Sequence, residues 1–172
     1  MEPTDTPWLT DDEQRTWRAF LRLHGRLDVA LGRHLQAGSE LSQADFGVLV
    51  QLTETRDGRS RAYELGRFLE WEKSRLSHHL TRMEKRGLVV RQDCPTDRRG
   101  AFVAVTPAGR RAIESAAPAH VREVRRLVFD VLTPAQVASL REISETLLQN
   151  LDGEGCAAEP GCGDPAPFLP HS

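Results

Sequence analysis

Residues 65–111 read LGRFLEWEKSRLSHHLTRMEKRGLVVRQDCPTDRRGAFVAVTPAGRR, and this stretch decides the fold. In its first half, side chains suited to packing recur at steps of three and four residues: Leu76, His79, Leu80 and Met83. This is the period of an α-helix with one buried face, so we expect a helix from about Glu72 to Arg86. Gly87 follows directly, and a glycine there can adopt the left-handed conformation that ends many helices.

The second half of the stretch predicts two strands. Residues 88–91 (LVVR) and 101–105 (AFVAV) are short runs rich in β-branched side chains, and residues 94–100 between them are rich in turn formers. Two such runs joined by a turn form a β-hairpin. Because Arg98 and Arg99 fall in the connecting segment, we expect the hairpin to have a long basic tip.

Helix start signals lie upstream of this stretch. Thr10, followed by Glu13, predicts a capped helix to about Gln36. Ser42 predicts a second helix to about Arg56, and Ser60 is a candidate cap for a short third helix.

Two more helices are expected downstream. Threonine–proline pairs at Thr106 and Thr133 predict helix starts, because a threonine can cap and a proline is tolerated at the first position. The first of these helices should reach about Val131 and the second about Leu151. The expected fold class is therefore mainly α with a small β-hairpin wing.

Charge is distributed unevenly along the chain. The net charge is −2, but residues 73–111 hold ten basic and three acidic residues, so this segment carries +7 and the rest about −9. One basic face on an acidic body suits a phosphate-binding surface. The alternative is a charged face that serves only solvation.

Two short helices directly before a basic hairpin form a winged helix-turn-helix. In such a domain one helix enters the major groove of DNA and the hairpin tip reaches the flanking minor groove. The N-terminal part of the recognition helix usually contacts base edges, which assigns to the bases Ser74, Arg75, Ser77 and His78. Phosphate contacts are assigned to Lys73 and Arg82. His79 is expected to be a core-edge histidine rather than a ligand.

The tip of the hairpin supplies three further DNA-binding candidates. Arg99 is expected to enter a narrow minor groove, and Arg98 to contact the phosphate backbone. Asp97 would repel phosphates, unless it faces Arg99 and holds that guanidinium in one orientation.

These residues resemble the MarR family of bacterial transcriptional regulators. The resemblance covers about residues 11–151 and is most specific at 65–76, 83–89, 95–100 and 105–109. It implies a homodimer joined through the first and the last two helices, which binds a pseudo-palindromic operator in double-stranded DNA. It also implies that a small-molecule effector or an oxidant weakens DNA binding. We expect a repressor.

The resemblance divides the chain into three parts. Residues 1–10 form an N-terminal arm, residues 11–151 the winged helix-turn-helix domain, and residues 152–172 a flexible tail. Within the domain, the DNA-binding lobe spans about 42–106 and the dimerisation helices span about 11–36 and 107–151. The long apolar stripes of the terminal helices also favour a dimer, because exposing several leucines is costly.

Trp17, His24 and Cys94 are secondary candidates. Trp17 and His24 lie on the stripe of the first helix, and members of the family tend to place their effector pocket beside that helix. The preferred alternative places both residues in the dimer core. Cys94 lies near basic residues that favour a reactive thiolate, which suggests a redox switch. The alternative is an incidental small residue, favoured because the family's peroxide sensors keep their cysteine near the first helix, where this chain has none.

Other classes of function find little support. Catalytic motifs and phosphate-binding loops are absent, so we expect no enzyme activity, no cofactor and no metal site. Cys156, Cys162 and His171 leave a metal store as one alternative. A winged-helix protein-interaction module is another, although such a module does not need an arginine pair at the hairpin tip. The acidic N-terminus and the lack of a long apolar run predict a cytoplasmic protein without membrane contact.

Overall fold

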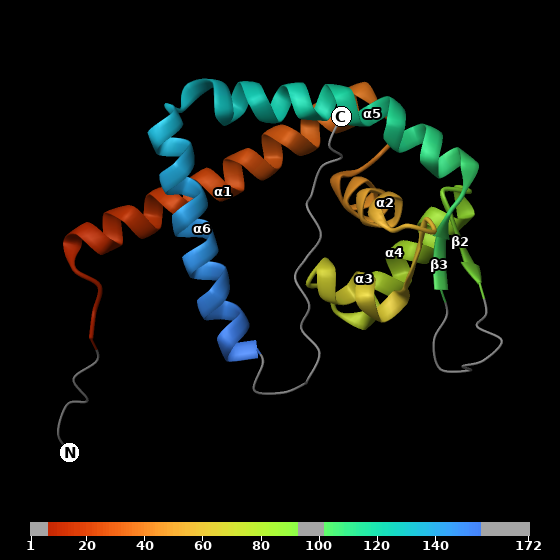
Figure 1. Ribbon diagram of the computed structural model, residues 1–172, viewed down its shortest axis with the longest axis horizontal. Helices are drawn as coiled ribbons and strands as arrows, with labels where there is room; N and C mark the ends of the chain where they lie inside the picture. Colours follow the sequence, from red (N-terminus) through yellow and green to blue (C-terminus); the bar gives the residue numbers. More distant parts are fainter. Residues whose placement is uncertain (1–6, 93–101, 156–172) are drawn as a thin grey trace, which may run out of the picture.

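The computed structural model describes residues 7–92 and 102–155. Its elements follow one another as α1 (Asp11–Gly38), α2 (Gln43–Glu54), β1 (Arg59–Arg61), α3 (Ala62–Phe68), α4 (Lys73–Lys85), β2 (Val89–Gln92), β3 (Phe102–Val105), α5 (Pro107–Leu127), η1 (Phe129–Val131, a 3-10 helix) and α6 (Pro134–Gly155). Helices dominate, and the strands form one small antiparallel sheet in the order β1-β3-β2 (Figure 1). This confirms the expected fold class.

The first two helices begin at the expected caps. The Thr10 hydroxyl accepts a hydrogen bond from the Glu13 amide at 3.3 Å, and the Glu13 carboxylate accepts one from the Thr10 amide at 2.7 Å. Ser42 and Asp45 form the same reciprocal pair at 3.1 and 2.9 Å. Each pair satisfies amides that the helix itself leaves unbonded.

The start of α5 fixes the helix against the sheet. The Thr106 hydroxyl accepts a hydrogen bond from the Gly109 amide at 3.0 Å and donates one to the Gly87 carbonyl at 2.6 Å. A Cβ at Gly109 would overlap the carbonyl oxygen of Leu88, so only glycine fits there. The spacing of Thr106 and Gly109 therefore holds the root of the hairpin beside α5.

The third helix differs from its prediction. Ser60 does not cap α3: it lies in β1, is 5% exposed, and donates a hydrogen bond to Glu64 at 3.0 Å. Arg61 takes the cap position, and its amide donates to the Glu64 carboxylate at 2.8 Å. The sequence did not predict β1, because three residues are too few for an alternating pattern to be recognised.

Two helices also end at residues other than those predicted from the sequence. The helix expected to reach about Val131 ends as α5 at Leu127 and is followed by η1. The last helix, α6, continues to Gly155, so residues 152–155, which were assigned to the flexible tail, are helical. The end of α6 lies where the apolar stripe weakens, whereas the end of α5 is followed by a 3-10 turn that keeps apolar side chains, so periodicity locates neither boundary well.

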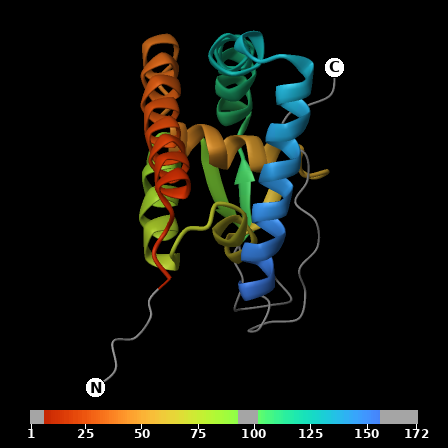
Figure 2. The same cartoon turned by 90° about the vertical axis from the view of Figure 1, so that its left-hand side faces the viewer.

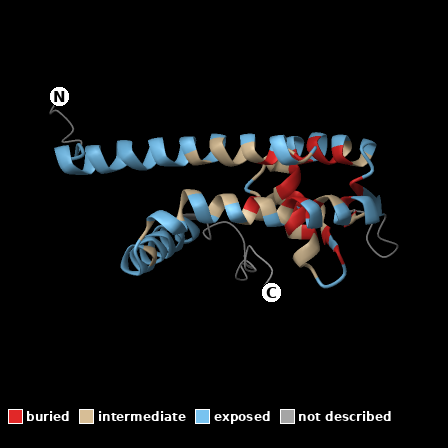
Figure 3. Cartoon of the chain, turned by 90° about the horizontal axis from the view of Figure 1, so that it is seen from above, coloured by how far each residue is buried: buried red, intermediate tan, exposed pale blue. Residues whose placement is uncertain are grey.

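The buried core lies at one end of the molecule, where α2, α3, α4 and the sheet meet the adjoining parts of α1 and α5 (Figure 3). Leu35 from α1 and Ile113 from α5 join this core. Its largest fully buried side chains are Leu41, Leu49, Leu52, Leu65, Leu80, Met83, Val48, Val89 and Val103. This core supports the sheet and α4 from one side.

The N-terminal part of α1 and the whole of α6 lie outside that core. Figure 2 shows α1 and α6 on opposite sides of the molecule, so their crossing in Figure 1 is not a contact. Large apolar side chains on both helices are about half exposed, including Trp17, Phe20, Leu21, Ile143, Leu147 and Leu151. Among the described residues, none of the helices combines the length and apolarity needed to cross a membrane.

Candidate nucleic-acid interface

Helix α4 has the two faces that its sequence predicts. Leu76, His79, Leu80 and Met83 are buried, which confirms the packing face. Gly87 has φ of 70°, which confirms the left-handed stop. The DNA-binding candidates on this helix are all exposed: Lys73, Ser74, Arg75, Ser77, His78 and Arg82. The structure therefore gathers them on one solvent-facing surface, while their contacts with DNA stay a prediction.

A buried ionic network fixes α4 to the start of α2. Asp45 is 2% exposed; it accepts a hydrogen bond from Arg86 Nη1 at 2.7 Å, and its Oδ1 lies 3.1 Å from His79 Nε2. Burial raises the pKa of Asp45, but contacts with His79, the Ser42 amide and Arg86 outweigh it and hold that pKa well below its ordinary value. The carboxylate is therefore ionised, and it joins the start of α2 to the middle of α4 and to its C-terminal end.

Two arginines on the exposed face are held through His79. The Arg75 guanidinium carbon lies 4.4 Å from the centroid of the Trp71 ring. Trp71 in turn meets the His79 ring edge to face, with centroids 5.1 Å apart. Arg82 Nη2 lies 3.0 Å from His79 Nδ1. His79 is 5% exposed, as expected for a core-edge histidine, so it gives Arg82 a fixed neighbour directly and supports Arg75 through Trp71.

Trp71 is a site residue that the sequence reasoning missed. It ends the turn between α3 and α4, where its amide donates to the Gly66 carbonyl at 2.9 Å. The available signal was its spacing from Arg75, since residues four apart around a helix start can stack. Trp71 is half-buried, and a cation over such a ring gains at least about 0.5–1 kcal/mol, enough to favour one orientation of the guanidinium.

Arg91 ties the hairpin to α4. Its Nη2 donates to the Ser77 carbonyl and to the Thr81 hydroxyl, both at 3.0 Å, and its amide donates to Glu84 at 3.1 Å. These bonds fix β2 along the helix. The predicted DNA contacts of the hairpin tip, Asp97, Arg98 and Arg99, lie outside the described residues, as does the redox candidate Cys94.

A hollow of about 640 Å³ lies beside the exposed face of α4, between α3, α4 and β2. Its lining includes Ala62, Tyr63, Trp71, Leu76, Ser77 and Arg91. Its apolar and aromatic surface also includes Leu80, and its charged or polar groups come from Arg67, Glu70, Glu72, Lys73, Ser77 and Arg91. Its size falls in the range of small-molecule sites in proteins.

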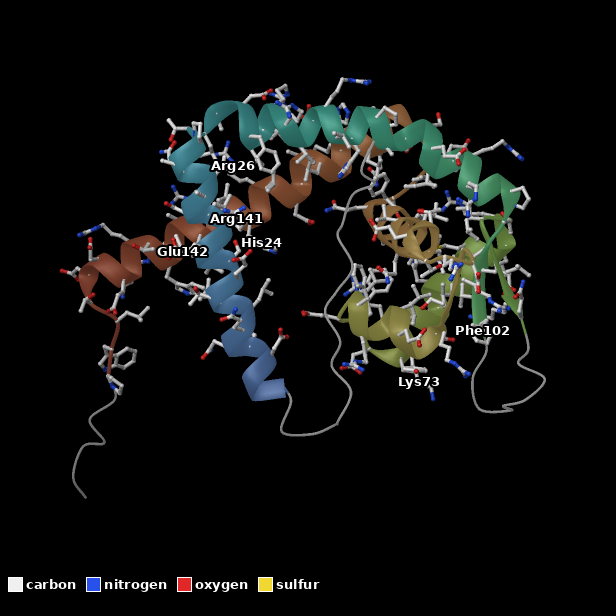
Figure 4. All side chains as sticks on the ribbon, viewed as in Figure 1. His24, Arg26, Lys73, Phe102, Arg141 and Glu142 are labelled. Carbon is white, nitrogen blue, oxygen red and sulfur yellow. The ribbon has the colours of Figure 1, made fainter. Side chains whose placement is uncertain are left out.

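The effector candidates on α1 are far from this hollow. Trp17 is 50% exposed and stacks on Phe20 with ring centroids 5.7 Å apart. Figure 4 shows His24 near the middle of α1, apart from Lys73 on the DNA-binding lobe. Whether the two residues contact an effector or lie in a dimer core stays a prediction. Within residues 7–92 and 102–155, no group of three or more His, Cys, Asp and Glu side chains is placed to hold a metal ion.

Comparison with known proteins identifies relatives of this chain. The family model described as the MarR family matches residues 41–100. AbsC, a MarR family transcriptional regulator from Streptomyces coelicolor, is 38% identical with a TM-score of 0.82, over 86% of this chain and 99% of its own. A search of curated proteins gave no match.

Two further solved structures contain bound molecules. Sco3205, a MarR family transcriptional regulator from Streptomyces coelicolor solved in complex with DNA, is 40% identical with a TM-score of 0.82, over 87% of this chain and 93% of its own. CouR from Rhodococcus jostii RHA1, bound to p-coumaroyl-CoA, is 25% identical with a TM-score of 0.67, over 83% of this chain and 95% of its own. Because the identity to AbsC and Sco3205 extends over nearly all of both proteins, this chain belongs to the MarR family of transcriptional regulators.

Proposed function

We propose that this protein binds a pseudo-palindromic operator in double-stranded DNA as a homodimer and represses transcription in the cytoplasm. The observation that carries the proposal is the exposed polar face of α4, on which Arg75 and Arg82 are held by Trp71 and His79. A cation held near the start of a recognition helix, as Arg75 is, suits base contacts, and one held in its last turn, as Arg82 is, suits phosphate contacts. Sco3205, a relative at 40% identity, was solved in complex with DNA, which supports DNA binding by this chain.

The exposed apolar faces of α1 and α6 support the dimer. Trp17 and Phe20 on α1 are 50% and 49% exposed, and Ile143 and Leu147 on α6 are 57% and 51% exposed. Fully burying one such side chain gains about 1.5–3 kcal/mol, so several on two helices can drive association. A two-fold dimer built on these faces presents two copies of α4 to two half-sites.

Release by a small-molecule effector is the second part of the proposal. CouR, a relative at 25% identity, was solved bound to p-coumaroyl-CoA. In this chain, the hollow beside α4 includes Trp71, which stacks on Arg75, and Arg91, which bonds to Ser77. A ligand in this hollow would compete with those contacts and so weaken DNA binding.

A gel shift with the DNA upstream of the protein's own gene tests the proposal. We expect a specific complex whose affinity falls steeply with salt, and a footprint with two half-site centres about 10 bp apart. Light scattering should give the mass of a dimer, and Ile143→Glu should reduce it to that of one chain. Binding without sequence preference, or a footprint without dyad symmetry, would contradict the proposal.

A further inference from the structure

The two oxygens of the buried Asp45 carboxylate have different neighbours. Oδ2 accepts hydrogen bonds from the Ser42 amide at 2.9 Å and from Arg86 Nη1 at 2.7 Å. Oδ1 lies 3.1 Å from His79 Nε2, at ion-pair distance. Burial raises the pKa of Asp45, but these three contacts outweigh it and lower that pKa, so both oxygens accept and neither can donate. The nitrogen that faces Oδ1 must therefore supply the proton.

His79 lies between that carboxylate and Arg82, with one ring nitrogen turned to each. Its Nε2 meets Asp45, while its Nδ1 lies 3.0 Å from Arg82 Nη2. A guanidinium can donate but not accept, so Nδ1 can meet it only through its lone pair. The carboxylate can accept but not donate, so Nε2 carries the hydrogen. The two neighbours thus select the neutral tautomer of His79 that has its proton on Nε2.

The bond to His79 orders Arg82 before DNA arrives. Arg82 is in the last turn of α4, and its side chain is exposed. A long exposed side chain loses rotamer freedom when it binds a partner, which costs about 2- to 12-fold in affinity for each side chain ordered. A bond to a buried ring removes part of that cost. The planar guanidinium keeps further N–H donors for phosphate oxygens.

We propose that Asp45 positions Arg82 for a DNA phosphate by keeping the proton of His79 on Nε2, so that Nδ1 accepts a hydrogen bond from Arg82. This inference rests on the proposed function, which assigns Arg82 to the phosphate backbone. Asp45 and His79 are 2% and 5% exposed, so both are positioning residues that do not touch DNA themselves. A carboxylate at the start of α2 thereby controls a contact made by the last turn of α4.

Asp45→Asn reverses the position of the proton with little change of shape. The amide oxygen must take the place of Oδ2, because the Ser42 amide and Arg86 both donate there. The NH2 group then faces His79 Nε2, which becomes the acceptor, so the ring proton moves to Nδ1. Nδ1–H and Arg82 Nη2 are both donors, and the bond that holds Arg82 is lost.

Ser42→Ala is the matched control. The Ser42 hydroxyl accepts a hydrogen bond from the Asp45 amide at 3.1 Å, so this variant also loses half of the capping pair of α2. It leaves the carboxylate, the Ser42 amide and the neighbours of His79 in place. Any effect on DNA binding that comes only from a weaker start of α2 should therefore appear in Ser42→Ala as well.

Two measurements test the proposal separately. In the free protein with isotope-labelled histidine, a long-range proton–nitrogen correlation NMR spectrum shows which ring nitrogen of His79 carries the proton, and His79→Gln identifies its signals. We expect Nε2 in the wild type and in Ser42→Ala, and Nδ1 in Asp45→Asn. Fluorescence anisotropy then measures operator affinity for these proteins, for Arg82→Gln and for Asp45→Asn/Arg82→Gln. It is done at a temperature at which thermal denaturation shows each variant to be folded.

We expect Asp45→Asn to weaken operator binding by about fivefold or more, since a dimer must then order two arginines on binding. Loss of a negative charge would by itself strengthen binding, so the sign is informative. The loss should be equal for the operator and its single-base variants, because Arg75 keeps its partner Trp71. It should vanish in the Arg82→Gln background, and Ser42→Ala should stay within about twofold of the wild type.

The outcomes separate this inference from the proposed function. It is wrong if His79 of the wild type carries its proton on Nδ1 or on both nitrogens, or if Asp45→Asn leaves the proton on Nε2. It is also wrong if Arg82→Gln binds as tightly as the wild type, or if the effect of Asp45→Asn persists without Arg82. If Ser42→Ala weakens binding as much as Asp45→Asn does, stability explains the loss and the inference fails. In all these cases the proposed function stands as long as the wild type prefers operator DNA. If the wild type shows no such preference, the proposed function fails, and this inference fails with it.

Discussion

Replacing Asp45 with alanine tests whether the network between α2 and α4 stabilises the fold. Loss of the capping carboxylate costs about 1 kcal/mol. Loss of the bond from Arg86 adds only about 1 kcal/mol, because the Arg86 side chain is 40% exposed and water can replace the carboxylate. Removing the acceptor beside the buried His79 adds about 1–2 kcal/mol. We expect a loss of about 3 kcal/mol and, for a chain of this size, a Tm lower by about 6–12 °C.

The Asp12–Arg15 pair offers a matched control. Its N–O distance of 2.7 Å equals that of the Asp45–Arg86 pair, but the side chain of Asp12 is 89% exposed whereas that of Asp45 is 3% exposed. Asp12→Ala should therefore change the free energy of unfolding by no more than about 0.5 kcal/mol. Both variants are melted by circular dichroism at one protein concentration, since dimer stability depends on concentration.

The pH dependence gives a second readout for Asp45. Its pKa in the folded protein is lowered, so its contribution to stability is present above the pKa of an unfolded aspartate, about 3.9. The contribution is lost as pH falls below that value. The difference in free energy of unfolding between the wild type and Asp45→Asn should therefore shrink as the pH falls below about 4. A gap that is independent of pH, or an Asp45→Ala variant no less stable than Asp12→Ala, would refute the reasoning.

Four further predictions concern other parts of the chain. Arg75→Ala should weaken operator binding by about 1–3 kcal/mol and relax the base preference at one base pair per half-site. Trp71→Leu should relax the preference at the same base pair. Competition with single-base operator variants measures both effects. In the hairpin tip, Asp97→Ala should weaken DNA binding, and its effect should vanish in an Arg99→Ala background; tighter binding by Asp97→Ala would contradict the pairing of these residues. The pKa of His120 is lowered by burial and by His34. Its neutral form therefore adds stability that is lost as pH falls below about 6.5, the pKa of an unfolded histidine. Between pH 7 and pH 5, the Tm of His120→Leu should fall less than the Tm of the wild type. Deleting residues 156–172 should leave operator affinity within about twofold, because that segment lacks a periodic apolar face; a larger change in a gel shift would assign it a role.

Features that depend on neighbours in sequence could be predicted. The caps at Thr10 and Ser42 and the left-handed Gly87 use residues at most three positions apart. The buried face of α4 follows from the helical period alone. Such features need no knowledge of the tertiary fold, so the sequence is sufficient for them.

Features that depend on distant partners could not be predicted. Asp45 and Arg86 are 41 positions apart, and each by itself is an ordinary charged residue of a helix end. Strand β1 exists only because β3 pairs with it, and its three residues have no pattern of their own. The placement of the Arg59 and Arg61 guanidiniums over the Phe102 ring depends on that pairing, so it could not be predicted before the register was known.

Helix α1 shows why a periodic stripe does not identify what covers it. The stripe continues along the helix, yet Leu35 is 3% exposed whereas Trp17 and Phe20 are 50% and 49% exposed. The difference cannot come from the period, which is the same at both ends. It arises because the core packs only on the C-terminal part of α1 (Figure 3). The N-terminal part thus carries an apolar face for which the described chain supplies no cover. Since α6 carries a similar uncovered face, a second copy can cover both through one two-fold axis.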